Sequence, residues 1–316
     1  MIETIELSKA YGKVCAVDSL TFTAQPGRVT GFLGLNGSGK TTTLRMLLGL
    51  TRPTSGQALI NGKPFTRLTH PVRQVGAVLE QGISHPGQSG RAHLITQAML
   101  AGTDRARVDT LLEQVGLTEA AHRRTGGYSL GMRQRLAVAT ALLGEPQVLI
   151  LDEPANGLDP EGIRWLRGFL RYLSSEGKTV LISSHLLAEV AQTVDDVVII
   201  ANGRSVAQGP ISDLQGEPTV LVRTPDRDEL ASALLAAGVV SEEDEANGLR
   251  VRTEDMARIG DVALRAGVAV HELRTLSTDL ESLYFELTTS PENRNRNLEG
   301  MPVQDAEPAV HQGVAS

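Results

Sequence analysis

The stretch Gly34-Leu35-Asn36-Gly37-Ser38-Gly39-Lys40-Thr41-Thr42 decides the fold, because it joins an apolar run at residues 29–33 to a helix-like segment at residues 42–50. Its glycines can adopt backbone dihedral angles closed to other residues, so successive N–H groups can point at one anion. The N-terminus of the following helix adds its positive end to the same point. The stretch therefore predicts a phosphate cradle at the end of a buried strand.

Two side chains give this cradle its chemistry. Lys40 is placed to reach the β- and γ-phosphates of a nucleotide, and the Thr41 hydroxyl is placed to ligate Mg²⁺, which prefers oxygen ligands. Taken alone, the pattern also fits a glycine-rich turn without a ligand. The apolar run before it and the helical segment after it favour the nucleotide site.

Composition narrows the function classes. The 316 residues, 41% of them apolar, can bury one large core or a large core and a small one. A formal charge of −7 argues against a general nucleic-acid binder, which needs concentrated positive charge. The single cysteine, Cys15, excludes an internal disulfide and suits a reducing compartment. Because no apolar run approaches the ~18 residues that span a bilayer, we expect a soluble chain whose membrane role would need a separate partner.

A second functional stretch is Val148-Leu149-Ile150-Leu151-Asp152-Glu153-Pro154. Four successive apolar residues are typical of a strand buried on both faces, and ligands collect at the carboxyl ends of such strands. We expect Asp152 to hold Mg²⁺, usually through water, and Glu153 to polarise the attacking water as general base. Two acids that cap the next helix are the alternative, which the upstream cradle disfavours.

Hydrophobic periodicity places both stretches in an α/β domain. Residues 3–24 alternate like two antiparallel strands around a turn at residues 11–13, and short strands are expected at residues 57–60 and 75–79. Residues 92–145 carry apolar stripes at helical spacing, which predicts a mostly helical insert. Another apolar strand, at residues 179–182, ends in Ser183-Ser184-His185.

In this order, the cradle, the Asp152-Glu153 strand end, Asn156-Gly157-Leu158-Asp159-Pro160 and Ser183-Ser184-His185 resemble the nucleotide-binding subunit of an ATP-binding-cassette (ABC) transporter. The stretch Tyr128-Ser129-Leu130-Gly131-Met132-Arg133-Gln134-Arg135 is similar to the signature loop of that family. The resemblance covers roughly residues 3–210 and implies an ATPase. It further implies that two copies close head to tail around two ATP molecules and drive separate transmembrane permease subunits from the cytoplasmic face of the membrane.

The resemblance also implies roles within one subunit. Tyr11 would stack on adenine, residues 34–42 would bind the phosphates, and His185 would sense the γ-phosphate and complete a catalytic set with Lys40 and Glu153. By residue type alone, a tyrosine near a turn is more often a packing residue. A histidine at a strand end is likewise more often a partly buried, hydrogen-bonded residue.

Across the subunit interface, Ser129 and Gly131 would contact the γ-phosphate held by the partner, and Asp159 would help to organise the interface. A second set of donors arriving from the partner would exclude water and stabilise the developing charge.

Two departures from the family pattern stand out. Leu130 and Met132 occupy signature-loop positions where glycine and glutamine are usual, which puts the catalytic rate in doubt more than binding. Glu80 stands where the family has a glutamine that links Mg²⁺ to the membrane partner, and Gln81 follows it. We assign Glu80 to the metal site and leave open whether Gln81 fills the coupling position. Both departures resemble bacterial antibiotic- and lantibiotic-export subgroups.

The composition shifts after Gly209-Pro210. The extension resembles that of drug-resistance exporter ATPases of the daunorubicin type. Its acidic run is expected to be a solvated loop, and its last helix to begin at the capping box Thr278-Asp279-Leu280-Glu281. The elements expected here are strand 219–223, helix 226–237, acidic loop 242–245, strand 249–252, helix 255–266, strand 268–273 and that last helix.

The sequence therefore predicts an α/β fold: a P-loop NTPase parallel-sheet core with an N-terminal antiparallel β subdomain and a helical insert, plus a small α/β C-terminal domain. The expected domains are residues 1–215, with the insert at about 83–145, then residues 216–289, and a disordered tail at 290–316 that is poor in large apolar side chains. No chemistry is expected in the C-terminal domain.

The predicted function is hydrolysis of ATP, with Mg²⁺, to drive export of a drug, antibiotic or lipid-like substrate. The expected partners are a transmembrane permease and a second copy of the chain, and no nucleic acid. The alternative is a non-transport ABC-type ATPase in a soluble or nucleic-acid-linked complex, although such chains usually carry two cassettes or long heptads. A small-molecule kinase or GTPase is disfavoured by the signature-like loop and by His185.

Overall fold

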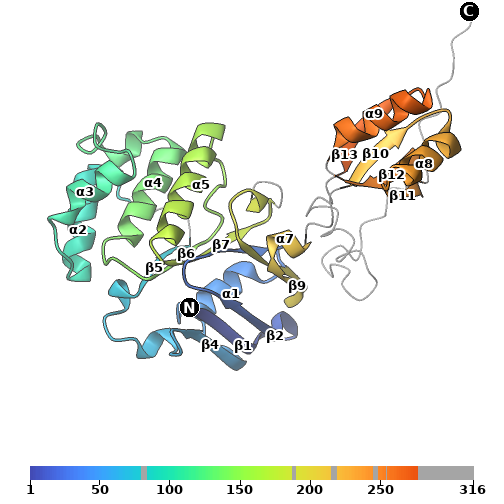
Figure 1. Ribbon diagram of the computed structural model, residues 1–316. Helices are drawn as coiled ribbons and strands as arrows, with labels where there is room; N and C mark the ends of the chain where they lie inside the picture. Colours follow the sequence, from blue (N-terminus) through green and yellow to red (C-terminus); the bar gives the residue numbers. More distant parts are fainter. Residues whose placement is uncertain (80–83, 187–189, 215–218, 245–247, 254, 277–316) are drawn as a thin grey trace, which may run out of the picture.

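The computed structural model describes residues 1–79, 84–186, 190–214, 219–244, 248–253 and 255–276. These residues form three β-sheets, of six, three and four strands. In the part built from residues 1–214, helices α2 to α5 lie on one side of the six-stranded sheet and the three-stranded sheet lies on the other (Figure 1). No helix among the described residues combines the length and apolar character needed to cross a membrane.

The six-stranded sheet carries the strand ends that matter for function. All neighbouring pairs are parallel except β8 and β9. Every residue of β3, β6 and β7 is buried, which confirms the prediction of strands covered on both faces. The strand order is β5 (Val75–Val78), β6 (Val148–Leu151), β7 (Thr179–Ser184), β3 (Val29–Leu33), β8 (Asp196–Ala201) and β9 (Arg204–Pro210).

The three-stranded sheet confirms the predicted N-terminal hairpin. Strand β1 (Ile2–Tyr11) pairs antiparallel with both β2 (Val14–Ala24) and β4 (Ser55–Ile60). A buried apolar cluster joins this sheet to α1 (Lys40–Leu47) and to the large sheet, where the rings of Phe22 and Phe32 stack at 5.1 Å. Helix α1 begins two residues earlier than expected, because Gly39 turns the chain at its N-cap with φ 106°.

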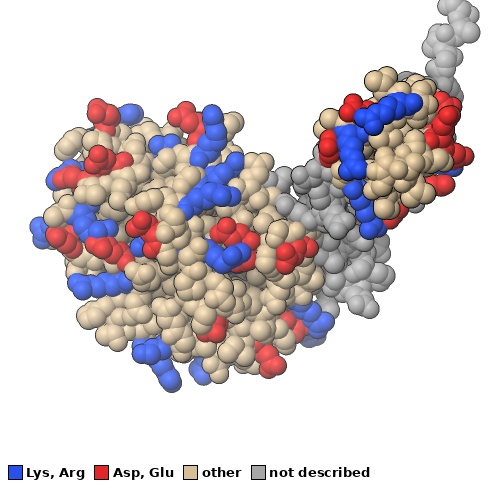
Figure 2. All heavy atoms as spheres, in the orientation of Figure 1, with Lys and Arg blue, Asp and Glu red and all other residues tan. Residues whose placement is uncertain are grey.

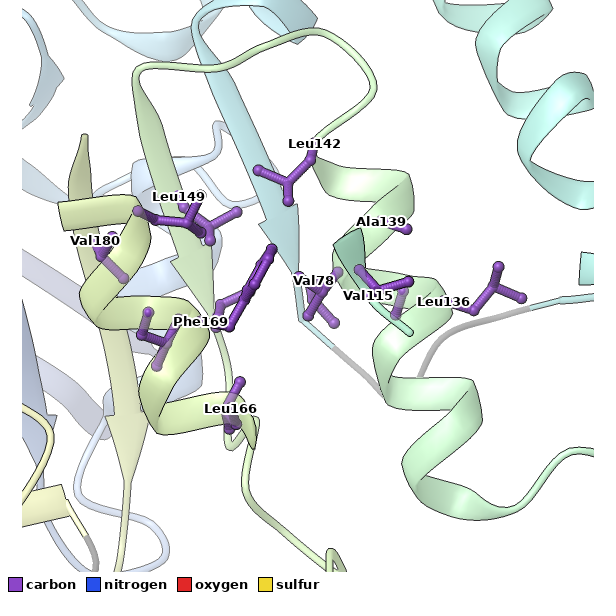
Figure 3. Packing of buried hydrophobic residues seen from close by; sticks show 14 of the residues in the cluster. Val78, Val115, Leu136, Ala139, Leu142, Leu149, Leu166, Phe169 and Val180 are labelled. Atoms are coloured by element: carbon purple, nitrogen blue, oxygen red, sulfur yellow. The ribbon is translucent and has the colours of Figure 1, made fainter. Parts of the chain in front are cut away.

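The predicted helical insert is also present. Leu136 of α4 and Leu166 and Phe169 of α5 belong to one buried cluster with residues of β5, β6 and β7, such as Val78, Leu149 and Val180 (Figure 3). Burying a side chain of this size stabilises the fold by about 1.5–3 kcal/mol. Besides α1, the described helices up to residue 214 are α2 (Gly90–Ala101), α3 (Arg107–Gln114), α4 (Leu130–Ala141), α5 (Pro160–Ser175) and α7 (Ile211–Leu214), with 3-10 turns η1 (Phe65–Arg67), η2 (Pro71–Arg73) and η3 (Thr125–Gly127).

The C-terminal sheet has the βαββαβ order of a ferredoxin-like fold, with all pairs antiparallel in the order β11-β12-β10-β13. Its buried cluster contains only residues between 220 and 273, so the described part of this region has a core of its own. The elements are β10 (Thr219–Arg223), α8 (Arg227–Ala236), β11 (Ser241–Asp244), β12 (Gly248–Arg252), α9 (Met256–Ala266) and β13 (Glu272–Leu276).

Two C-terminal predictions are wrong. The acidic run expected as a loop is strand β11 up to Asp244, because arginines of β12 neutralise it: Arg252 Nη2 lies 2.5 Å from Glu242 Oε1, and Arg250 Nη2 lies 2.7 Å from Asp244 Oδ1. The last strand begins at Glu272 rather than at residue 268, because Val268 is buried in the core just after the helix C-cap.

The remaining C-terminal predictions fall outside the described residues. They are the last helix, its capping box and the tail at 290–316. The domain division near residue 215 also falls on residues that the structure does not describe, and it stays a prediction.

Candidate active site

The residues of the cradle fold as a tight loop between β3 and α1. Gly37 and Gly39 have φ angles of 83° and 106°, which favour glycine. Close neighbours exclude a side chain at two positions: a Cβ would lie 2.5 Å from the carbonyl oxygen of Ala16 at Gly39, and 2.6 Å from that of Ile200 at Gly34. Strands β2 and β8 therefore hold the loop in place, and only glycine fits there.

Ser38 supplies a test of whether the loop fits a phosphate. Its Oγ is buried and has no hydrogen-bond partner among the described residues. It lies close to Gly34, where a Cβ would be 2.5 Å from it. A buried hydroxyl without a protein partner is costly unless a ligand satisfies it, so the loop fits an anion with oxygen acceptors.

Lys40 connects the loop to the carboxylates. Its Nζ donates to the carbonyl oxygens of Gly34, at 2.7 Å, and Leu35, at 3.3 Å. The same atom lies 3.2 Å from Oε1 of Glu153, and the residue is only 5% exposed. One buried cation is thus shared between the cradle and the end of β6.

Asp152 and Thr41 bring two oxygen ligands together. The Thr41 hydroxyl donates to Oδ2 of Asp152 at 2.9 Å, and the Ser183 hydroxyl donates to Oδ1. Oxygen donors from the cradle helix and from a strand end fit Mg²⁺, which usually takes one or two protein ligands and completes its shell with phosphate and water. Among the described residues, no cluster of three or more His, Cys, Asp or Glu side chains forms a metal cage.

Glu153 occupies a special backbone position just after β6. Its φ of 48° lies in the left-handed region, which is uncommon for a residue with a side chain. Its N–H donates to Oγ of Ser183 at 2.9 Å, and its Oε2 lies 2.8 Å from Nδ1 of His185. Glu153 thus has Lys40 at one carboxylate oxygen and His185 at the other, while its side chain stays 24% exposed for a water to approach.

Ser183 is the functional residue that the sequence analysis missed. Its hydroxyl bonds both Asp152 and the N–H of Glu153, so it fixes the two acids relative to each other. The parallel register that pairs Leu151 with Ile182 puts Ser183 beside Asp152. The hydroxyl at the end of an apolar strand was the available signal, but its meaning depends on which strand is the neighbour of β6.

Tyr11 ends β1 on the hairpin that approaches the cradle. Its ring is 52% exposed, with Nζ of Lys9 at 4.9 Å from the ring centroid. The following strand meets the loop at Ala16, whose carbonyl oxygen lies against Gly39. An exposed aromatic face on this hairpin suits a base-stacking role, which stays a prediction.

The residues expected to act on the partner subunit form a second group. Ser129, Gly131 and Asp159 line one pocket of about 370 Å³, which does not include Lys40, Asp152 or Glu153. Ser129 caps α4 by accepting from the N–H of Met132 at 3.2 Å, and Asp159 caps α5 by accepting from the N–H of Gly162 at 2.7 Å. The structure thus places these three residues apart from the group that joins Lys40, Glu153 and His185.

Glu80 lies outside the described residues, as does Gln81. Strand β5, which leads toward them, is a direct neighbour of β6, and the N–H of Asp152 donates to the carbonyl oxygen of Val78 at 2.7 Å. On the face in view, basic and acidic side chains are interspersed (Figure 2).

Comparison with known proteins gives matches in both parts of the chain. Residues 17–156 match the family described as ABC transporter, and residues 218–281 match a domain of unknown function, DUF8746. An uncharacterized ABC transporter ATP-binding protein of Bacillus subtilis (strain 168), YhcH, is 36% identical over 279 residues, which cover 86% of this chain and 90% of YhcH. The bacitracin transport ATP-binding protein BcrA of Bacillus licheniformis is 43% identical over 218 residues, or 68% of this chain and 71% of BcrA.

A solved structure described as the ATP binding subunit of an ABC transporter is also similar. It superimposes with a TM-score of 0.61 at 31% sequence identity, over 68% of this chain and 91% of that chain. The fold predicted from the sequence is thus found in a protein of the same kind as the relatives.

Proposed function

Because this chain belongs to the ABC transporter family of ATP-binding proteins, we propose that it hydrolyses ATP to drive export through separate transmembrane permease subunits. The observation that carries the chemistry is the contact of Glu153 with both Lys40 and His185 beside the phosphate cradle. A carboxylate between two donors, partly open to water, is arranged to accept a proton from an attacking water.

In this proposal the residues around the cradle divide phosphate binding, proton transfer and positioning among them. The backbone of residues 34–42 and the Ser38 hydroxyl bind the phosphates, and Lys40 leaves its carbonyl partners to neutralise the β- and γ-phosphates. Glu153 takes the proton of the water, while His185 keeps the Glu153 carboxylate oriented and contacts the γ-phosphate. Ser183 holds Glu153 in its left-handed conformation, so that the base is positioned before the substrate arrives.

Thr41 and Asp152 would hold Mg²⁺. Their oxygens already lie 2.9 Å apart, so both can reach one ion. When bound, Mg²⁺ neutralises charge on the β- and γ-phosphates. Glu80 is the third proposed metal-facing residue, and it rests on sequence alone.

We propose that the second group of residues acts on a second copy of the chain. Ser129, Gly131 and Asp159 line a pocket that is separate from Glu153, so a head-to-tail homodimer would let them complete the partner's site. Tyr11 would stack on adenine in its own subunit. In this arrangement each ATP is enclosed by two subunits, which excludes water other than the reactant.

The membrane side of the proposal rests on similarity. BcrA is named for the transport of bacitracin, and we propose that this chain serves a drug, antibiotic or lipid-like substrate, bound by a permease at the cytoplasmic face of the membrane. We further propose that residues 216–289 form an accessory domain that supports pairing of the subunits, because their described part has its own core.

The test is co-expression with the membrane protein encoded next to this gene. We expect the two proteins to co-purify, and we expect their co-expression to lower accumulation of the exported compound in cells. The Glu153→Gln variant should still co-purify with the membrane protein but should abolish efflux. Efflux that is equal with the Glu153→Gln variant would contradict ATP-driven export by this chain.

A further inference from the structure

Two loops contact each other beside Ser129 and Asp159, and each loop contributes one leucine and one glycine to the contact. We call this contact the interlock. Leu130-Gly131 lies at the start of α4, and Gly157-Leu158 lies in the loop between β6 and α5. A Cβ on Gly157 would overlap Cδ2 of Leu130, and a Cβ on Gly131 would lie 3.6 Å from Cδ2 of Leu158. Each leucine therefore lies over the glycine of the other loop.

The interlock joins two helix N-termini. Leu130 directly follows Ser129, the N-cap of α4, and Leu158 directly precedes Asp159, the N-cap of α5. Both leucines are half-buried, whereas Ser129 and Asp159 are exposed at the pocket of about 370 Å³. Packed side chains favour discrete arrangements over continuous deformation, so the two exposed caps should move as one unit.

The two glycines of the interlock differ in how well they would tolerate a side chain. Gly157 has φ 72°, which favours glycine, and a Cβ there would meet Cδ2 of Leu130, so the leucine side chain would have to shift. At Gly131 a Cβ would make only ordinary van der Waals contact inside the subunit. The tight contact is thus the one between Leu130 and Gly157.

We propose that Leu130 and Gly157 are positioning residues that hold Ser129 and Asp159 in the relative placement needed to close on the ATP of the partner subunit. This inference rests on the proposed head-to-tail ATPase dimer. It also gives a role to Leu130, which stands where the family usually has glycine. A glycine there would leave the backbone more freedom, whereas Leu130 contacts the neighbouring loop.

The test measures ATP-dependent dimerisation of the full chain by analytical ultracentrifugation, with Glu153→Gln as the background in every sample. Gly157→Ala adds a methyl group that meets Leu130, and Leu130→Ala with Gly157→Ala removes that clash. Gly177→Ala is the matched control, because Gly177 has φ 81° and no atom within 4 Å of an added Cβ, so it reports the backbone cost alone.

We expect Gly157→Ala to weaken the ATP-bound dimer by about 10-fold or more relative to Gly177→Ala, as overpacking at a tight contact predicts. Binding of a fluorescent ATP analogue to the monomer should stay within about two-fold, because Lys40 and the cradle are untouched. The double variant should form a tighter dimer than Gly157→Ala, because truncation of Leu130 removes the clash, but a weaker dimer than Gly177→Ala, because the contact made by Leu130 is lost. Equal dimer affinity of Gly157→Ala and Gly177→Ala, or no recovery in the double variant, would overturn the inference.

A second pair of variants avoids the strained glycine in case Gly157→Ala does not fold. Leu130→Ala should weaken the dimer and leave monomer binding of the ATP analogue unchanged, whereas the conservative Leu130→Met should keep the dimer affinity within about two-fold. Equal dimer affinity of Leu130→Ala and the background would overturn the inference. If the Glu153→Gln background itself stays monomeric at saturating ATP, the proposed function fails, and this inference fails with it.

Discussion

Nδ1 of His185 lies 2.8 Å from Oε2 of Glu153, so the ends of β7 and β6 meet at one carboxylate. The other oxygen of that carboxylate is 3.2 Å from Nζ of Lys40, at the start of α1. Three elements that are far apart in the sequence thus converge on Glu153. Because Glu153 contacts both neighbours, the loss of either neighbour should change how the Glu153 carboxylate is oriented.

The first prediction concerns Lys40. Its ammonium neutralises the phosphates in both the ground state and the transition state, so Lys40→Ala should weaken ATP binding and lower turnover, each by about 10-fold or more. Lys63→Ala removes an exposed lysine at a turn and serves as the control. Titration with a fluorescent ATP analogue and a steady-state ATPase assay measure the two effects. Unchanged affinity in Lys40→Ala would count against the cradle.

The second prediction concerns pH. Burial lowers the pKa of His93, whose Nε2 lies 3.2 Å from Oγ1 of Thr140. The unfolded chain therefore binds this proton at a higher pH than the folded chain does, and stability falls as the pH drops below the unfolded value of 6.5. One such proton changes the free energy of unfolding by up to about 1.4 kcal/mol for each pH unit.

The check is thermal unfolding at pH 7.5 and at pH 5.5. The melting temperature of the wild type should fall between these values by more than that of His93→Gln, which cannot titrate. An equal fall in both proteins would mean that His93 makes no contribution to the pH dependence.

The third prediction concerns Mg²⁺ and the segment outside the described residues. We propose that Glu80 faces the metal site, where its carboxylate would add a negative charge near Asp152 and the phosphates, so ATP hydrolysis should depend more steeply on Mg²⁺ than with an amide. Glu80→Gln should lower that dependence and leave efflux largely intact, whereas Gln81→Ala should impair efflux more than ATP binding. Mg²⁺ titrations of the ATPase rate and efflux in cells measure both. The opposite pattern would exchange the roles of Glu80 and Gln81.

The fourth prediction concerns the C-terminal region. A chain ending at Gly216 should still bind ATP, because the cradle and the strand ends around it belong to residues 1–214 and the C-terminal core is separate. In the Glu153→Gln background, its ATP-dependent dimer should be weaker than that of the full chain, if the region supports pairing. Loss of all nucleotide binding after truncation would assign this region to the catalytic core instead.

The sequence could predict those parts of the site whose functional residues are neighbours in the sequence. Gly39 and Lys40 lie in one loop, and Asp152 and Glu153 follow one apolar strand, so their roles could be argued from neighbouring residues. The carboxyl ends of the parallel strands then predicted a ligand site at Asp152 and Glu153. The contact of His185 with Glu153 was not predicted, because the family resemblance assigned His185 to the γ-phosphate.

Contacts that depend on strand order or on distant packing could not be predicted. Ser183 bonds Asp152 only because β7 is the neighbour of β6, and Leu130 covers Gly157 only in the folded chain. The acidic run at Glu242 looked like a loop, because the arginine that neutralises it, Arg252, lies on the neighbouring strand.

The most direct test of the account is ATP hydrolysis by Glu153→Gln. An amide cannot accept the proton of the attacking water, so turnover should fall by about 100-fold or more, while ATP affinity is kept and an ATP-bound dimer accumulates. Glu176→Gln, at an exposed glutamate after α5, should hydrolyse ATP like the wild type. Hydrolysis by Glu153→Gln at the rate of the wild type would contradict the assignment of Glu153 as the general base.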